Sequence, residues 1–314
     1  MENKIGNIKL DSRLILAPMA GVNTAAFRLL CRENGAGLVS TPMIHVRQVT
    51  SLESNIIERT AFLKDEKPIS VQLVGADTDY AKQATLLLDE YADIFDINFG
   101  CPDKDVLGNK EGGFFSKHPE QMKKMISPVI SNTNKPVTAK IRIGWDEKTV
   151  NVLESVKILQ ELGVDAIAIH GRTVKQGYSG KANWDLIKQA KEIVDIPIIG
   201  NGDVFKPGNA KAMIDQTKCD FAMIGRGSMG NPMLFKRCNH LLETGENLPE
   251  TSKEERIENA KKFLDYYEKY ENNRSFTESR QQVMWFMKEF DGASEYRKKL
   301  MNAKTFPELK DIIL

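Results

Sequence analysis

Short apolar runs alternate with longer amphipathic stretches along the chain as far as Gly225. Each run ends on a small or polar residue, which is the pattern of a buried strand, and each intervening stretch is long enough for a helix. The expected strands are Arg13–Pro18, Gly37–Thr41, Ile69–Leu73, Phe95–Phe99, Val137–Ile141, Ala166–His170, Ile198–Asn201 and Phe221–Gly225. Strands that alternate with helices in this way predict an α/β fold, a parallel (β/α)8 TIM barrel.

A purely helical pattern follows the alternation. A barrel of this kind needs about 240 residues, which leaves roughly 70 for a second unit. The polar stretch 244–250 predicts a linker. Beyond it, apolar residues recur at helical spacing, which is typical of a bundle core: Ile257, Ala260, Phe263, Leu264 and Tyr267, then Val283, Met284, Phe286, Met287 and Phe290. We therefore expect a barrel domain over residues 1–242 and a smaller all-helical domain over residues 243–314.

Composition limits the class of protein and its cellular location, but it does not identify a ligand. The formal net charge is +1, so an attraction to a polyanion would need cations gathered on one surface. No apolar run reaches the roughly 18 residues of a membrane span, and the N-terminus has no signal-peptide core. The four cysteines are scattered without a CxxC pair. This favours reduced thiols in the cytoplasm over disulfides, a zinc site or an iron–sulfur cluster.

The candidate chemistry lies where the predicted strands end. The carboxyl ends of barrel strands meet on one face, and active sites form there. The residues at this address are Pro18, Gln72, Asn98, Cys101, Lys140, His170, Asn201–Asp203 and Gly225–Arg226. Such a concentration of polar residues predicts one pocket.

A glycine-rich segment at residues 225–230 matches the G-x-G-x-x-G dinucleotide pattern. It follows the last strand of the alternation, however, whereas that pattern belongs to the first turn of a βαβ unit. In barrels the loops after strands 7 and 8 form the usual phosphate site. We therefore interpret Arg226 and Asn201-Gly202-Asp203 as the two halves of a site for one phosphate, with plain glycine turns as the alternative.

Gln72, Lys140 and His170 would present donors to an anionic or carbonyl-rich ring in the same pocket. A phosphate site beside ring donors fits flavin mononucleotide (FMN), since a cation near the flavin stabilises its anionic reduced form. Pro18, at the end of the first strand, begins a stretch that lets the backbone approach a flat ligand. The alternative for Lys140 is a solvated position on the rim.

Cys101 differs from the other three cysteines, which we expect to be small buried hydrophobes. It lies between Gly100 and Pro102 on the loop after the fourth strand, at the active face. An unperturbed thiol has a pKa of about 8.5 and is mainly protonated at neutral pH. A general acid is therefore a better role for Cys101 than a nucleophile.

With these residues in place, the chain resembles the dihydrouridine synthases, flavoenzymes that reduce uridines in tRNA. The matching segments are Ala-Pro-Met-Ala-Gly-Val (17–22) with Phe27-Arg28, Gln72, Asn-Phe-Gly-Cys-Pro (98–102), Lys140-Ile141-Arg142, His-Gly-Arg-Thr (170–173) with Gln176, Tyr178 and Gly180, Asn-Gly-Asp (201–203), Gly-Arg-Gly (225–227), and residues 280–288 with Gly292-Ala293 and Arg297. The chain departs from the common pattern at Thr41-Pro42-Met43 and within residues 104–115, which concerns the choice of uridine more than the chemistry.

The resemblance implies cofactor contacts, a proton donor and a substrate. FMN contacts fall on Pro18, Met19, Ala20, Gln72, Lys140, His170, Asn201, Gly202, Asp203, Gly225 and Arg226. Cys101 becomes the proton donor to C5 of the uracil, reduced flavin the hydride donor to C6, NADPH the reductant and tRNA the partner. Candidate substrate-binding residues are Asn98, Arg142 and Arg172 near the pocket, and Arg274, Arg280, Arg297, Lys298 and Lys299 on the helical domain.

Two other functions remain open from the sequence. One is a flavin barrel that acts on a free pyrimidine or another small molecule, although such a substrate needs no helical appendage. The other is an RNA-binding or chaperone protein without catalysis, against which the intact set of Lys140, His170 and Cys101 argues.

Overall fold

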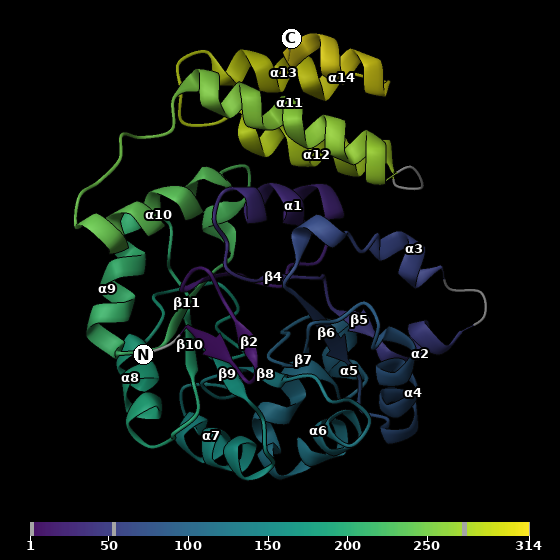
Figure 1. The fold of residues 1–314 in the computed structure, drawn as a ribbon, viewed down its shortest axis with the longest axis vertical. Helices are drawn as coiled ribbons and strands as arrows, with labels where there is room; N and C mark the ends of the chain where they lie inside the picture. Colours follow the sequence, from purple (N-terminus) through teal and green to yellow (C-terminus); the bar gives the residue numbers. More distant parts are fainter. Residues whose placement is uncertain (1–2, 52–54, 272–274, 314) are drawn as a thin grey trace.

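Eight parallel strands form the centre of the protein (Figure 1). The computed structural model describes residues 3–51, 55–271 and 275–313. The strands are β3 (Leu14–Leu16), β4 (Val39–Ser40), β6 (Ile69–Val74), β7 (Ile94–Phe99), β8 (Val137–Arg142), β9 (Ala166–His170), β10 (Ile198–Asn201) and β11 (Phe221–Ile224). Their order is β3-β11-β10-β9-β8-β7-β6-β4, and a parallel bridge between Ile15 and Leu38 joins the two ends of the sheet. The predicted barrel is confirmed.

Helices surround this barrel, and each of the longer ones buries apolar residues on one side. They are α1 (Ala25–Glu33), α4 (Thr78–Leu88), α6 (Lys123–Ile130), α7 (Val152–Glu161), α8 (Trp184–Glu192), α9 (Pro207–Thr217) and α10 (Met233–Thr244), with the short α2 (Val46–Thr50), α3 (Ile56–Thr60) and α5 (Lys104–Gly108). Helix α1 illustrates the local signals. The Thr24 side chain caps its first turn by accepting from the Phe27 N–H, and Phe27 and Leu30 are buried.

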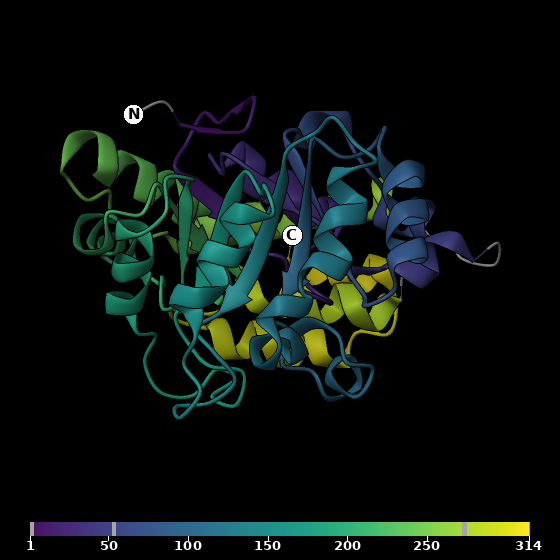
Figure 2. The ribbon, with the colours of Figure 1, turned by 90° about the horizontal axis from the view of Figure 1, so that it is seen from below.

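Three very short strands were missed by the sequence pattern, because two residues show no periodicity. Strands β1 (Lys4–Ile5) and β2 (Ile8–Lys9) form an antiparallel hairpin, and β5 (Ile44–His45) pairs with β6. Ile5 and Leu10 are buried in one cluster with barrel residues such as Ile15. Figure 2 shows the purple hairpin at the upper edge and long teal loops at the lower edge. The hairpin therefore covers the barrel end opposite these loops.

The last four helices form a layer at the top of Figure 1, and the first of them packs against α1. They are α11 (Lys253–Tyr270), α12 (Phe276–Phe286), α13 (Ala293–Asn302) and α14 (Phe306–Ile313). Ser252 and Glu255 form a capping box at the start of α11. The rings of Phe263 and Phe286 lie 5.6 Å apart, within a cluster that also contains Phe27 of α1. The division proposed after residue 242 falls in the last turn of α10.

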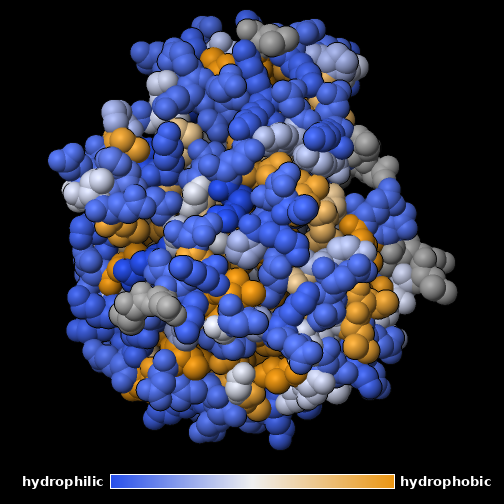
Figure 3. All heavy atoms as spheres, in the orientation of Figure 1, coloured by the Kyte–Doolittle hydropathy of each residue, from blue (hydrophilic) through white to orange (hydrophobic). Residues whose placement is uncertain are grey.

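The outer surface is largely polar. Most of the face seen in Figure 3 is hydrophilic, with apolar patches between the polar side chains. Among the described residues, no helix combines the length and the apolar character that crossing a bilayer requires.

Candidate active site

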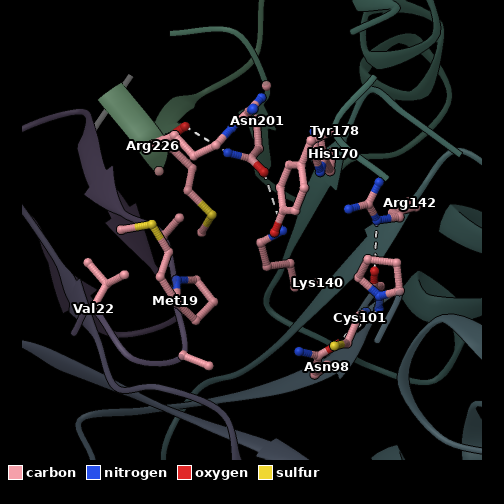
Figure 4. A pocket seen from close by; sticks show the side chains of 18 of the residues that line it. Met19, Val22, Asn98, Cys101, Lys140, Arg142, His170, Tyr178, Asn201 and Arg226 are labelled. Carbon is pink, nitrogen blue, oxygen red and sulfur yellow. Dashed lines mark hydrogen bonds between the residues drawn. The ribbon is translucent and has the colours of Figure 1, made fainter. Parts of the chain in front are cut away.

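A cavity of about 500 Å³ opens at the carboxyl ends of the strands. Its lining includes these predicted residues: Pro18, Met19, Ala20, Gln72, Asn98, Cys101, Lys140, Arg142, His170, Asn201, Gly202, Asp203, Gly225 and Arg226. Figure 4 shows several of them converging from opposite walls. The predicted residues near the strand ends thus share one cavity, except Arg172.

Lys140 points into this cavity from β8. Its Nζ lies 3.3 Å from Oδ1 of Asn201, whose Nδ2 donates to the Met223 carbonyl at 2.9 Å. Burial and the nearby Arg142 lower the pKa of Lys140 to about 8, so the ammonium is still mostly charged at neutral pH. The pKa of His170 lies far below its usual range. Burial is the largest cause, and the charge of Lys140 is the next. The cavity therefore offers a cation beside a neutral imidazole.

Cys101 lies in the loop after β7, the strand that pairs with β8. The backbone N–H groups of Gly100 and Cys101 donate to Oδ1 of Asn98, at 3.0 and 2.9 Å. The Gly113 N–H donates to the Cys101 carbonyl at 2.9 Å, and a Cβ on Gly113 would meet that carbonyl oxygen at 2.7 Å. Cys101 is partly exposed, and burial raises its thiol pKa. A loop held in this way presents a neutral thiol to the cavity.

Two buried arginines fix the loops around the cavity. Arg142 donates from Nε to the Gly100 carbonyl at 2.8 Å and from Nη1 to the carbonyls of Thr173 and Gly177, at 2.9 and 2.7 Å. Arg172 is 2% exposed and donates from Nη2 to both carboxylate oxygens of Asp203. Arg172 therefore fixes the loop that carries Asp203. The role of Arg172 in substrate binding stays a prediction.

Arg226 lies at the mouth of the cavity, between two aromatic rings. Its guanidinium carbon is 4.6 Å from the ring centre of Tyr178 and 5.5 Å from that of Phe205. Its Nη2 lies 3.9 Å from Oδ1 of Asp203. Tyr178 and Phe205 are 59% and 45% exposed, which is unusual for rings of this size. Phe205 was absent from the sequence prediction, and its only signal is its place two residues after Asp203.

Four of the predicted cations of the helical region lie outside the cavity lining: Arg280, Arg297, Lys298 and Lys299. Arg280 donates from Nη1 to the carbonyls of Met301 and Ala303, at 3.1 and 3.2 Å. Arg297 is exposed and donates to the Met287 carbonyl, and Lys298 and Lys299 are exposed on α13. Arg274 lies outside the described residues. A tRNA surface on these helices stays a prediction.

Helix α12 and the residues just after it contact two loops of the cavity wall. Gln282, which is fully buried, donates to the Gly21 carbonyl at 2.9 Å, and Lys288 donates to the Met229 carbonyl at 2.8 Å. A Cβ on Gly230 would lie 2.1 Å from the backbone of Trp285. Gly21 and Gly230 follow β3 and β11, which are neighbours in the barrel. The helical region therefore braces one side of the cavity.

Comparison with protein families assigns nearly the whole chain to one family. Residues 15–313 match the family model described as "Dihydrouridine synthase (Dus)". The tRNA-dihydrouridine synthase B of Vibrio vulnificus is 36% identical over 300 residues, covering 94% of this chain and 92% of that protein. The protein of the same name from Pasteurella multocida is 36% identical over 314 residues, covering 99% of this chain and 94% of its own.

Solved structures show the same fold at low identity. Morphinone reductase matches with a TM-score of 0.58 and 13% identity, over 80% of this chain and 91% of its own. An old yellow enzyme homologue from Zymomonas mobilis matches with a TM-score of 0.55 and 13% identity, over 81% of this chain and 94% of its own. At such identities the likeness concerns the barrel alone.

Proposed function

The chain belongs to the dihydrouridine synthase family, and we propose that it reduces uridines of tRNA to 5,6-dihydrouridine with FMN as cofactor and NADPH as reductant. The family membership supports the reaction and the tRNA substrate. The donors of the cavity support the cofactor, and the thiol of Cys101 supports the role of a proton donor.

The donor set of the cavity fits FMN. Among the described residues, Lys140 Nζ has only Asn201 as a hydrogen-bond partner, which leaves donors of the ammonium available to a ring oxygen or nitrogen. Arg226, at the mouth, would hold the phosphate with a charge-assisted hydrogen bond. The Ala17–Ala20 backbone offers a narrow wall for a flat ring, since it carries small side chains apart from Met19. When bound, FMN would carry a hydride from NADPH to C6 of the uracil.

Three residues of the chain would then complete the reduction. The Lys140 ammonium would lie beside the electron-rich edge of the flavin ring and stabilise negative charge there. Cys101 would donate the proton of its Sγ to C5 of the uracil, because the raised pKa keeps this proton on the thiol at neutral pH. Arg142, which is buried beside Cys101 and lines the cavity, would keep the loop closed around the base.

The observation that carries the proposal is that Cys101 and Lys140 line the same cavity. The test begins with purification of the protein and identification of its cofactor by absorbance and mass spectrometry. The protein is then incubated with NADPH and with tRNA from cells that lack dihydrouridine synthases. We expect a yellow protein and tRNA nucleosides heavier by two hydrogens. A flavin protein that oxidises NADPH but reduces only free pyrimidines would contradict the proposal.

A further inference from the structure

A chain of side-chain hydrogen bonds crosses the barrel interior and ends on Cys101. Thr138 Oγ1 and Gln72 Nε2 donate to the two carboxylate oxygens of Asp96, each at 2.6 Å. Asn98 Nδ2 donates to Gln72 Oε1 at 2.8 Å. Asn98 Oδ1 then accepts the backbone N–H of Cys101. The chain therefore starts at a buried carboxylate and finishes at the proposed proton donor.

The strand register brings these side chains together. Gln72 of β6 and Thr138 of β8 are the cross-strand partners of Asp96 on β7. Asp96 is 5% exposed and is absent from the cavity lining. It can therefore affect a bound substrate only through its neighbours.

The direction of the hydrogen bonds is fixed at both ends. Asn98 Oδ1 accepts from two backbone N–H groups, so the amide of Asn98 must turn its Nδ2 toward Gln72. Gln72 must accept this hydrogen bond through Oε1, and its Nε2 then faces Asp96. Only an acceptor at position 96 satisfies that last donor. A buried carboxylate provides it, and a reversed Gln72 would place two donors against each other.

Opposing influences act on the pKa of Asp96, and burial, which raises it, is the largest. Burial raises the pKa of Asp96, while the hydrogen bonds from Thr138 and Gln72 and the charge of Lys140 lower it. All three compensating groups come from the two neighbouring strands. The same groups that use the carboxylate as an acceptor therefore favour its ionised form.

We propose that Asp96 is a positioning residue that orients Gln72 and Asn98 and thereby holds the backbone of Cys101 in place. The inference rests on the proposed function, because it assigns Asp96 to the placement of the proton donor. It predicts that the position of the thiol depends on the acceptor at residue 96 more than on the charge there.

Three variants separate the acceptor from the charge. Asp96→Leu has a similar shape but removes the acceptor that orients Gln72. Asp96→Asn can turn its Oδ1 toward Gln72 and its Nδ2 toward Thr138 Oγ1, which preserves the chain without the charge. Thr138→Val is the matched control, because it removes a hydrogen bond to the same carboxylate on the side away from Gln72.

Two measurements on the flavin-loaded protein read the position of Cys101. The first is the alkylation rate of Cys101 by iodoacetamide, followed by peptide mass; Cys31, Cys219 and Cys238 are buried. The second is the rate at which anaerobic tRNA reoxidises the reduced flavin. For Asp96→Leu we expect alkylation to quicken at least threefold, because the loop of Cys101 loosens. Reoxidation should slow by about tenfold to a hundredfold, the equivalent of one buried donor left without an acceptor. Asp96→Asn and Thr138→Val should stay within about threefold of the wild type.

Each outcome decides the inference. Wild-type rates in Asp96→Leu would overturn it, and so would equal losses in Asp96→Leu and Asp96→Asn, which would assign the effect to charge alone. If Asp96→Leu does not fold, Asp96→Ala removes the same acceptor without added bulk and receives the same measurements. If the wild type reduces no tRNA, the proposed function fails, whereas the alkylation rates still decide whether Asp96 positions Cys101.

Discussion

Arg172 donates to both carboxylate oxygens of Asp203, at 2.7 and 2.9 Å. Asp203 also accepts the Ala182 N–H at 2.7 Å, so this pair joins the loops that follow β9 and β10. The carboxylate of Asp203 faces a guanidinium that is almost fully buried. The backbone of Asp203 has a φ of 60°, in the left-handed region. The pair therefore fixes the loop of Asp203, which lines the cavity, while Arg172 lies outside the lining.

Replacing Arg172 tests this structural role. Arg172→Met should lower the free energy of unfolding by roughly 1–3 kcal/mol, because the carboxylate of Asp203 loses a charged partner. The salt dependence of tRNA binding should not change, since the Arg172 side chain is buried and paired with Asp203. Thermal melting and filter binding across a salt series measure the two effects. A flatter salt dependence would mean that Arg172 contacts a phosphate.

Arg226 tests the phosphate end of the cofactor site. Arg226→Ala should weaken FMN binding by about tenfold to a hundredfold, because it loses a charge-assisted hydrogen bond. Lys206→Ala is the matched control, since Lys206 is an exposed cation on the loop after β10. Flavin titration of the apoprotein gives both affinities. An unchanged affinity in Arg226→Ala would place the phosphate elsewhere.

Cys101 tests the separation of the two half-reactions. Cys101→Ala should still bleach its flavin with NADPH, because that step needs no proton for a uracil carbon. The reduced flavin should then persist when anaerobic tRNA is added. Stopped-flow absorbance follows both steps, and Cys101→Ser shows whether a weaker acid restores part of the rate. Reoxidation of Cys101→Ala at the wild-type rate would exclude Cys101 as the acid.

Lys140 gives the cofactor site a pH dependence. The charged ammonium would favour the bound flavin, and the pKa of Lys140 is about 8. Above that pH the charged fraction falls about tenfold per unit, so the dissociation constant of FMN should begin to rise near pH 8. Below pH 8 it should be flat with respect to this group. In Lys140→Met the dissociation constant should be higher and should show no rise near pH 8. A rise that survives in Lys140→Met would come from another group.

Lys298 and Lys299 test the proposed tRNA surface. Replacing both by Gln should weaken tRNA binding and make the slope of log affinity against log salt shallower, by about 0.9 for each phosphate that the variant no longer neutralises. FMN content should not change. Lys123 and Lys124 are the matched control, because they are adjacent exposed lysines on α6 at the other end of Figure 1. Equal effects of the two double variants would indicate net charge alone.

The sequence pattern was sufficient for the barrel because its strands are continuous apolar runs. Ala166–His170 and Ile198–Asn201 have the predicted bounds, while β4 retains only Val39–Ser40 of a longer prediction. The N-terminal hairpin gave no such signal. Its two-residue strands depend on the tertiary contacts of Ile5 and Leu10.

The candidate site was only partly accessible from the sequence. Residue type and position at the end of a strand were enough to predict that Lys140, His170 and Cys101 line one cavity. They did not show that Arg172 pairs with the carboxylate of Asp203. The interior chain from Asp96 was also missed, because it depends on the register between three strands.

The contact between Gly230 and Trp285 has a consequence for how the protein can be divided. The turn after the last barrel strand has no room for a side chain, since the end of α12 occupies that space. A shortened protein that ended in the linker would leave the Gly21 and Met229 carbonyls without their donors and one flank of α1 open to water. The barrel and the helical region are thus expected to fold and to fail together. The loops on one side of its cavity rest on the same helical region that would receive the tRNA.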